Sequence, residues 1–221
     1  MKKIVIFGTG NLGRLAYIHF SSEGRYEVAA FTVDEEFLDE KTVFELGVVP
    51  FEKIEQAYPP ESFSMFVAVG YKKANKARAQ IYEECKARGY DLVSCLSSRF
   101  NQLEYVQTGE NCLIMPHVII QPYAEIGNDV IVWGGSCIGY QSRIGDHAYI
   151  EPAAAIAGNV NIGQYCFIGV NATIKDGVNI APECVIGAGA VILKDTERGR
   201  VYRGQSAEIS PYLSEELNYF K

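Results

Sequence analysis

Residues 156–174 read IAGNVNIGQYCFIGVNATI, and isoleucine returns in this stretch at every sixth position. The same step, extended in both directions from Ile114 to Ile192, meets fourteen positions, of which thirteen hold isoleucine and one holds Val132. Two residues before each of them stands a small or β-branched residue, such as Cys166 or Ala172. A period of six fits neither an α-helix nor a two-faced strand. It fits a triangular coil in which each six-residue unit is one short strand and one turn, so we predict a left-handed parallel β-helix of hexapeptide repeats.

The composition limits the partners of the chain. The 221 residues carry a net charge of −7, whereas a nucleic acid or an anionic membrane surface requires a basic face. The sequence contains no apolar run near the roughly 20 residues of a membrane span. The six cysteines form no C-x-x-C pair and are expected to be free thiols. We therefore expect a cytoplasmic protein with no nucleic-acid partner, no membrane insertion and no metal.

The first part of the chain has a different pattern. An apolar strand at 3–7 precedes Gly8-Thr9-Gly10-Asn11-Leu12-Gly13, an apolar-periodic helix follows, and a second strand at 27–33 ends in Asp34. Glycines between a strand and a helix allow main-chain amides to receive a phosphate. A domain of this length supplies only one mononucleotide half, so a nucleotide-sugar fits it better than a dinucleotide.

These patterns divide the chain into three parts. Residues 1–96 are predicted to form an α/β, Rossmann-like half-domain that binds a nucleotide or nucleotide-sugar. Residues 97–200 are predicted to form the left-handed β-helix and to be an acyltransferase domain. Residues 201–221 are predicted to be a C-terminal tail with a short helix near 211–220.

The combination of a Gly-x-Gly-x-x-Gly domain with hexapeptide repeats resembles the bacterial hexapeptide-repeat nucleotide-sugar acetyltransferases, of the sialic acid O-acetyltransferase and bacillosamine N-acetyltransferase type. The resemblance covers nearly the whole chain and is strongest in the segments 157–163, 166–172 and 186–190. It implies a homotrimer, with acetyl-CoA as co-substrate in the cleft between adjacent β-helices and a UDP- or dTDP-linked amino sugar held by the N-terminal domain.

The resemblance also implies roles for individual residues. Gly158 would offer its amide to the thioester carbonyl, while Tyr149, Gly169, Gly187 and Ala188 would lie beside the cofactor. The residues implied in substrate binding are Gly8, Gly10, Asn11, Leu12, Asp34, Gly70, Tyr71, Lys72 and Asn75.

The residues expected to carry the chemistry depart from the family pattern. Tyr140 and Gln141 stand where the family has a histidine base and its acidic neighbour. Tyr149 and Trp133 replace a histidine and an asparagine, and Gln205-Ser206-Ala207 replaces the usual proline-containing segment. We take Tyr140 and His147 as the candidate catalytic residues and leave Glu151 as another candidate base.

The missing histidine favours an amine acceptor. A tyrosine of ordinary pKa about 10 is a poor base at neutral pH, but a neutral amine attacks a thioester without prior deprotonation. We therefore expect an acetyl-CoA-dependent N-acyltransferase of surface glycan biosynthesis. The alternative is a catalytically lapsed relative that binds a nucleotide-sugar or a partner without acetyl transfer. A γ-carbonic anhydrase would need three zinc-binding histidines, and the predicted β-helix holds only two histidines.

Overall fold

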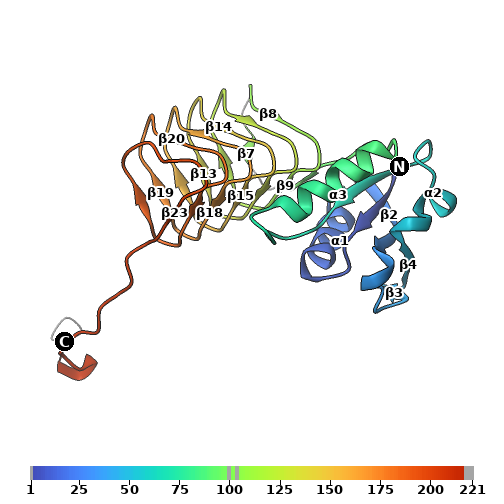
Figure 1. Ribbon diagram of the computed structural model, residues 1–221, viewed down its shortest axis with the longest axis horizontal. Coiled ribbons are helices and arrows are strands. Elements are labelled where there is room, and N and C mark those ends of the chain that lie inside the picture. The colour runs from blue at the N-terminus through green and yellow to red at the C-terminus, as the bar shows by residue number, and fades with distance from the viewer. Residues whose placement is uncertain (1, 99–100, 103–104, 217–221) are drawn as a thin grey trace.

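The computed structural model describes residues 2–98, 101–102 and 105–216. The chain forms an α/β domain at one end of a long parallel β-helix, and the C-terminal segment extends from the opposite end (Figure 1). Both predicted architectures are confirmed.

A five-stranded sheet forms the centre of the first domain. Its order is β3(Thr42–Val43), β4(Leu46–Pro50), β2(Tyr26–Val33), β1(Lys2–Phe7) and β5(Phe63–Val67). All neighbours are parallel except β3 and β4, a short antiparallel pair that the sequence pattern did not indicate.

Successive residues of β1 face opposite sides of this sheet, as the pleat requires. Ile4 and Ile6 pack on the side of α1(Asn11–Glu23), in a hydrophobic core continuous with that of the β-helix. Val5 and Phe7 pack on the other side, in a separate core beneath α2(Ile54–Ala57) and α3(Lys76–Ala87). The domain is therefore joined to the β-helix through α1 and leaves α3 to make a second contact.

Every predicted six-residue unit forms a two-residue strand that ends in its isoleucine or valine. Each of these residues is at most 6 % exposed, and Cys112, Cys166 and Cys184 are buried in the neighbouring small positions. The strands lie in three parallel sheets, which hold every third strand. The fourteen strands are β9(Leu113–Ile114), β10(Ile119–Ile120), β11(Glu125–Ile126), β12(Ile131–Val132), β13(Cys137–Ile138), β14(Arg143–Ile144), β15(Tyr149–Ile150), β16(Ala155–Ile156), β17(Asn161–Ile162), β18(Phe167–Ile168), β19(Thr173–Ile174), β20(Asn179–Ile180), β21(Val185–Ile186) and β22(Val191–Ile192).

The β-helix also includes a coil before the isoleucine repeat. It consists of β6(Cys95–Leu96), β7(Asn101–Gln102) and β8(Gln107–Thr108), which pair with β9, β10 and β11. The repeat did not reveal this coil because the register positions 102 and 108 hold glutamine and threonine rather than isoleucine.

The turns between strands share one backbone feature. Fifteen residues, at every sixth position from 105 to 189, have a positive φ angle. Asparagine, aspartate and glycine tolerate this left-handed conformation best, and they fill about half of these positions. Since each coil contains three turns, these corner residues form three columns with a spacing of 18 residues.

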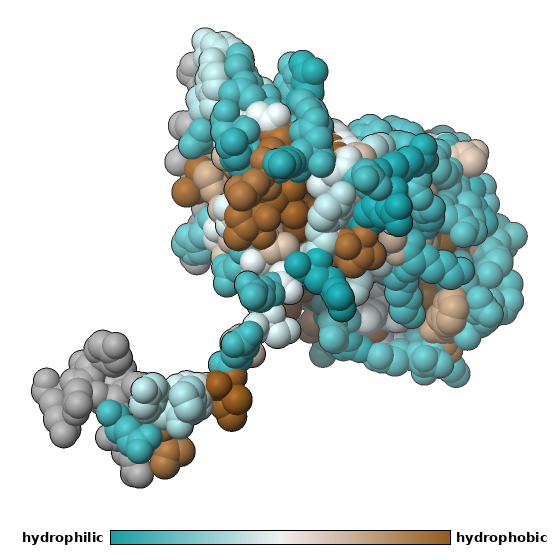
Figure 2. All heavy atoms as spheres, turned by 60° about the vertical axis from the view of Figure 1, so that its left-hand side comes forward, coloured by the Kyte–Doolittle hydropathy of each residue, from teal (hydrophilic) through white to brown (hydrophobic). Residues whose placement is uncertain are grey.

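The C-terminal segment leaves the β-helix after β23(Val201–Tyr202), which pairs with β21. Its only described helix is the short 3₁₀ element η3(Ser214–Glu216), and the end of the predicted helix, 217–221, lies outside the described residues. Ile209 is 98 % exposed, and Figure 2 shows this segment standing away from the body of the molecule. No helix in the described part of the chain has the length and apolarity needed to cross a membrane.

Candidate functional site

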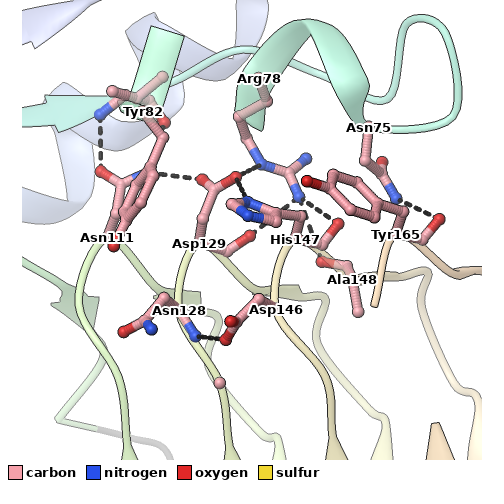
Figure 3. Close-up of polar contacts among 12 residues, drawn as sticks. Asn75, Arg78, Tyr82, Asn111, Asn128, Asp129, Asp146, His147, Ala148 and Tyr165 are labelled. Atoms are coloured by element: carbon pink, nitrogen blue, oxygen red, sulfur yellow. Dashed lines mark hydrogen bonds and ion pairs between the residues drawn. The ribbon is translucent and has the colours of Figure 1, made fainter. Parts of the chain in front are cut away.

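One column of corner residues joins the two domains. It consists of Asn111, Asp129, His147, Tyr165 and Glu183, at the corner between the sheet of β14 and the sheet of β15. Helix α3 of the first domain lies along this column and contacts it over most of its length (Figure 3).

Asp129 is the centre of this interface. Its carboxylate is fully buried, with Oδ2 3.0 Å from Nε of Arg78 and 2.9 Å from Nδ1 of His147, while Oδ1 accepts a hydrogen bond of 2.7 Å from the Asn111 amide. Arg78 is also fully buried, and its Nη2 donates to the main-chain oxygens of Asp129, His147 and Ala148. A buried charge is tolerated when it is paired in this way.

His147 is therefore held inside the domain interface. Its ring is only 7 % exposed, stacks on Tyr165 at 4.8 Å between centroids, and meets the edge of Tyr82 at 5.4 Å. Its Nδ1 is engaged by Asp129. The structure thus places this candidate catalytic residue where it orients α3, and it is not among the residues that line the pocket described below.

The far end of the interface is more exposed. The Asn75 amide, directly before α3, donates to the carbonyls of Tyr165 and Cys166. Lys76 forms an ion pair of 2.6 Å with Glu183, which also pairs with Arg198. These hydrogen bonds and ion pairs hold the pKa of Glu183 at about 2.

A pocket of about 590 Å³ lies between the two domains, at the start of α1. Gly8 and Gly13 shape its glycine turn: Gly8 has φ of +114°, and a Cβ at Gly13 would lie 1.9 Å from the Gly8 oxygen. Gly10 has open space around its Cα, so the pocket reaches the first turn of α1. The pocket is lined by Gly10, Asn11, Leu12, Leu15, Ala68, Gly70, Tyr71, Trp133 and Tyr149.

Aromatic residues form the β-helix wall of this pocket. Trp133 Nε1 donates a hydrogen bond of 2.8 Å to the Tyr149 hydroxyl, and Tyr149 stacks on Phe167. Tyr71 of the first domain contacts both rings edge-on. Burial raises the pKa of Tyr149 to about 12, so its hydroxyl stays protonated at neutral pH. Arg78 lies behind this wall, with its guanidinium carbon 5.7 Å from the Tyr149 ring centroid.

The pocket brings together about half of the residues predicted to bind the substrate. Gly10, Asn11, Leu12, Gly70 and Tyr71 line it. Gly8 supports the turn behind it, and Asp34 and Lys72 are outside the lining. Asn75 is buried at the α3 interface, where its amide is already hydrogen-bonded.

The residues predicted to bind the cofactor, other than Tyr149, lie at the two corners of the β-helix that flank one sheet, the sheet that contains β13, β16 and β19. These two corners are called the edges of that sheet below. Gly158 follows β16 at one edge, where the Asn159 amide donates to the Tyr140 oxygen at 2.8 Å, so Tyr140 and Gly158 are neighbours. Gly169, Gly187 and Ala188 lie at the opposite edge. Within this chain, Tyr140 is thus separated from His147, which lies at a different corner of the β-helix.

Sequence reasoning missed Arg78, Asp129 and the pocket residues Leu15 and Ala68. The 18-residue spacing of Asn111, Asp129 and His147 was available in the sequence, because residues one coil apart must be neighbours in a β-helix. The spacing does not reveal which column of corner residues contacts α3, because that depends on how the two domains are joined.

The family comparisons agree with this architecture. Residues 3–85 match the PglD N-terminal domain, residues 105–140 and 141–176 match the bacterial transferase hexapeptide (six repeats), and residues 159–194 match the hexapeptide repeat of succinyl-transferase. The chain thus combines a PglD-type N-terminal domain with transferase hexapeptide repeats, and the predicted resemblance to hexapeptide-repeat nucleotide-sugar acetyltransferases is confirmed. No curated protein sequence matches the chain.

Three solved structures are similar over nearly the full length. A histidine-to-asparagine variant of perosamine N-acetyltransferase from Caulobacter crescentus, with CoA and GDP-perosamine, is 26 % identical, with coverage of 95 % of this chain and 97 % of that chain and a TM-score of 0.84. PerB from Caulobacter crescentus, with the same two ligands, is 25 % identical, with 92 % and 91 % coverage and a TM-score of 0.78. The acetyltransferase domain of PglB from Neisseria gonorrhoeae, with acetyl coenzyme A, shares the fold at 24 % identity, with 92 % and 96 % coverage and a TM-score of 0.82.

Proposed function

We propose that this protein is an acetyl-CoA-dependent N-acetyltransferase that acts on a nucleotide-linked amino sugar in surface glycan biosynthesis. The observation that carries the proposal is the interdomain pocket, in which the first turn of α1 faces an aromatic wall. Main-chain amides at a helix N-terminus favour a phosphate, and the aromatic wall offers stacking surface for a base or sugar. The Caulobacter crescentus relatives, which hold CoA and GDP-perosamine, support the same substrate class.

The main-chain amide of Gly158 supports acyl transfer. Within the described residues it has no hydrogen-bond acceptor, while the Gly158 carbonyl accepts a bond of 3.0 Å from Gly177. A free amide at this corner is available to a thioester oxygen, whose negative charge grows as a nucleophile attacks. Tyr140 lies beside it and stays a candidate for contact with the reacting groups.

The two edges of the β13 sheet favour a site between protomers. Gly158 at one edge and Gly187 at the other cannot line a single groove of one β-helix, because the sheet separates them. A heterologous contact, with one edge of a protomer against the other edge of its neighbour, would bring them to a shared cleft. Such a contact closes into a ring of three when each subunit is rotated by a third of a turn from the last. We propose a homotrimer with acetyl-CoA in this cleft, which sedimentation equilibrium tests directly.

Thiol release from acetyl-CoA tests the function. We expect release with one member of a panel of UDP-, dTDP- and GDP-linked amino sugars, and none with sugars that carry only hydroxyl groups. Gly10→Phe should abolish binding of that sugar, since its side chain would enter the pocket. Gly47→Phe is the matched control, because Gly47 also has open space around its Cα but lies on β4, outside the pocket lining.

The outcomes distinguish an active N-acetyltransferase from a protein that binds a nucleotide-sugar without transferring an acetyl group. Thiol release that depends on the amine supports the N-acetyltransferase. No release from any member, together with Gly10-dependent binding of a nucleotide-sugar, would instead support a protein that keeps the pocket without transferring an acetyl group. Robust acetylation of a hydroxyl-only sugar would contradict the preference for an amine.

A further inference from the structure

None of the described residues that line the pocket carries a carboxylate or an imidazole. Among the described lining residues only Tyr71 and Tyr149 carry ionisable side chains, and Tyr149 is held protonated by burial. His147 is engaged with Asp129 inside the interface, and Tyr140 stands at another corner of the same β-helix. The proton that the amine nitrogen loses after its attack on the thioester therefore needs an acceptor at the rim of this pocket.

Glu151 stands at that rim. It follows β15 directly, two residues after Tyr149, and the pairing of Val132 with Ile150 places it one coil from Trp133. Its main chain is fixed: the amide donates to the Ile168 oxygen at 2.8 Å, and its carbonyl accepts a bond of 2.9 Å from the Ser136 hydroxyl. The side chain thus starts from a rigid position next to both β-helix residues of the pocket lining.

The Glu151 carboxylate is partly buried and uncommitted. Every other carboxylate in the interface described above is paired: Asp129 with Arg78, and Glu183 with Lys76 and Arg198. Within the described residues Glu151 has no side-chain hydrogen bond and no ion pair. A carboxylate placed beside an apolar pocket without a partner is costly to bury unless a ligand or a proton occupies it.

We propose that Glu151 is the general base of the acetyl transfer, an assignment that rests on the proposed function. The amine nitrogen of the sugar forms a bond to the thioester carbonyl carbon, and the carbonyl electron pair moves to oxygen. The Glu151 carboxylate takes a proton from this nitrogen. The carbonyl re-forms as the carbon–sulfur bond breaks, and the departing thiolate receives the proton from Glu151 to give CoA thiol. No further reactant is required.

The electrostatic surroundings agree with this role. Burial raises the pKa of Glu151 above its ordinary value of 4.5, and no neighbouring cation opposes the shift. A carboxylate with a raised pKa binds a proton more strongly, and general bases work best when their pKa approaches the working pH. Arg78, whose guanidinium carbon lies 5.7 Å from the Tyr149 ring centroid, is paired with Asp129 and forms no ion pair with Glu151 among the described residues.

Glu151→Gln tests the assignment, because it keeps size and polarity but cannot accept the proton. We expect kcat to fall by about 100-fold or more, with KM for both substrates and the calorimetric Kd for the nucleotide-amino sugar within about twofold of the parent values. Glu151→Asp, which retains a carboxylate, should keep more of kcat than Glu151→Gln. Glu125→Gln is the matched control, since Glu125 is an exposed carboxylate on another face, paired with Arg143.

The outcomes are distinct. If the parent protein releases CoA thiol and Glu151→Gln keeps kcat within about threefold, the Glu151 assignment is overturned while the proposed function stands. Equal losses in Glu151→Gln and Glu151→Asp that are accompanied by weaker sugar binding would also overturn it, because they indicate a role in binding. If the parent protein releases no thiol with any amino sugar, the proposed function fails and the assignment fails with it.

Discussion

The ion pair between Arg78 and Asp129 provides the sharpest test of how the two domains are held together. Both side chains are fully buried, and Arg78→Met would keep an unbranched chain in the same space. The substitution removes the ion pair of 3.0 Å and the three hydrogen bonds that Nη2 donates to main-chain oxygens. It leaves the Asp129 carboxylate buried, with only Asn111 and His147 as partners.

The expected cost follows from this burial. Removing one partner of a buried pair costs about 3–5 kcal/mol, because the remaining charge stays out of water. An exposed pair contributes at most about 1 kcal/mol. Arg143→Met is the matched control, since Arg143 pairs with Glu125 at 3.2 Å but is 67 % exposed. A second change, Asp129→Asn, removes the stranded charge, so the double variant should regain at least about 1 kcal/mol relative to Arg78→Met.

Fluorescence of Trp133 reports on the interface directly. It is the only tryptophan in the chain, and it lies in the pocket between the domains. In a denaturant titration the midpoint of its signal should shift strongly in Arg78→Met, little in Arg143→Met, and partly back in the double variant. The reasoning is refuted if Arg78→Met costs no more than Arg143→Met, or if Asp129→Asn destabilises it further.

Two further predictions concern the acid response and the core. The folded-state pKa of Glu183 lies at about 2, below its ordinary 4.5, so its stabilising contribution is complete above the unfolded-state pKa and is lost as the pH falls from about 4.5 to about 2. The difference in melting temperature between the parent protein and Glu183→Gln should therefore shrink on acidification across this range, and a constant difference would contradict the sign. Ile156→Ala removes a side chain that is 2 % exposed and should cost about 2–5 kcal/mol by far-UV circular dichroism in denaturant. Val191→Ala, at a position that is 61 % exposed, should stay within about 0.5 kcal/mol, and equal losses would mean that the repeat does not define the core.

The β-helix was predictable because its period is visible in the residues themselves. Ile114 to Ile192 repeat without an insertion, and each position proved to be a buried strand residue. The first coil was hidden because register positions 102 and 108 are polar. The β3–β4 pair was missed for a related reason: two- and five-residue strands are too short for a hydrophobic alternation to stand out.

The candidate site was predicted only in part. Gly10, Asn11 and Tyr71 follow from a glycine motif and a loop, and the pocket does bring them together. His147 looked available for chemistry because the sequence does not show which corner faces α3. Arg78 carried no signal at all, since an arginine in a predicted surface helix is ordinarily solvated. The surroundings of His147 and of Arg78 are both determined by how one domain docks on the other, which depends on contacts between residues far apart in the sequence.

The corner column also limits how the chain can change in length. The partners of α3 recur only once per coil, at intervals of 18 residues, whereas the β-helix itself accepts any whole six-residue unit. Losing one such unit between β6 and Asn111 would preserve the isoleucine core but turn the first domain by a third of a revolution, onto a corner that lacks Asp129 and His147. Tolerated insertions and deletions in this region should therefore come in complete coils of 18 residues, even though the core alone would permit single six-residue units.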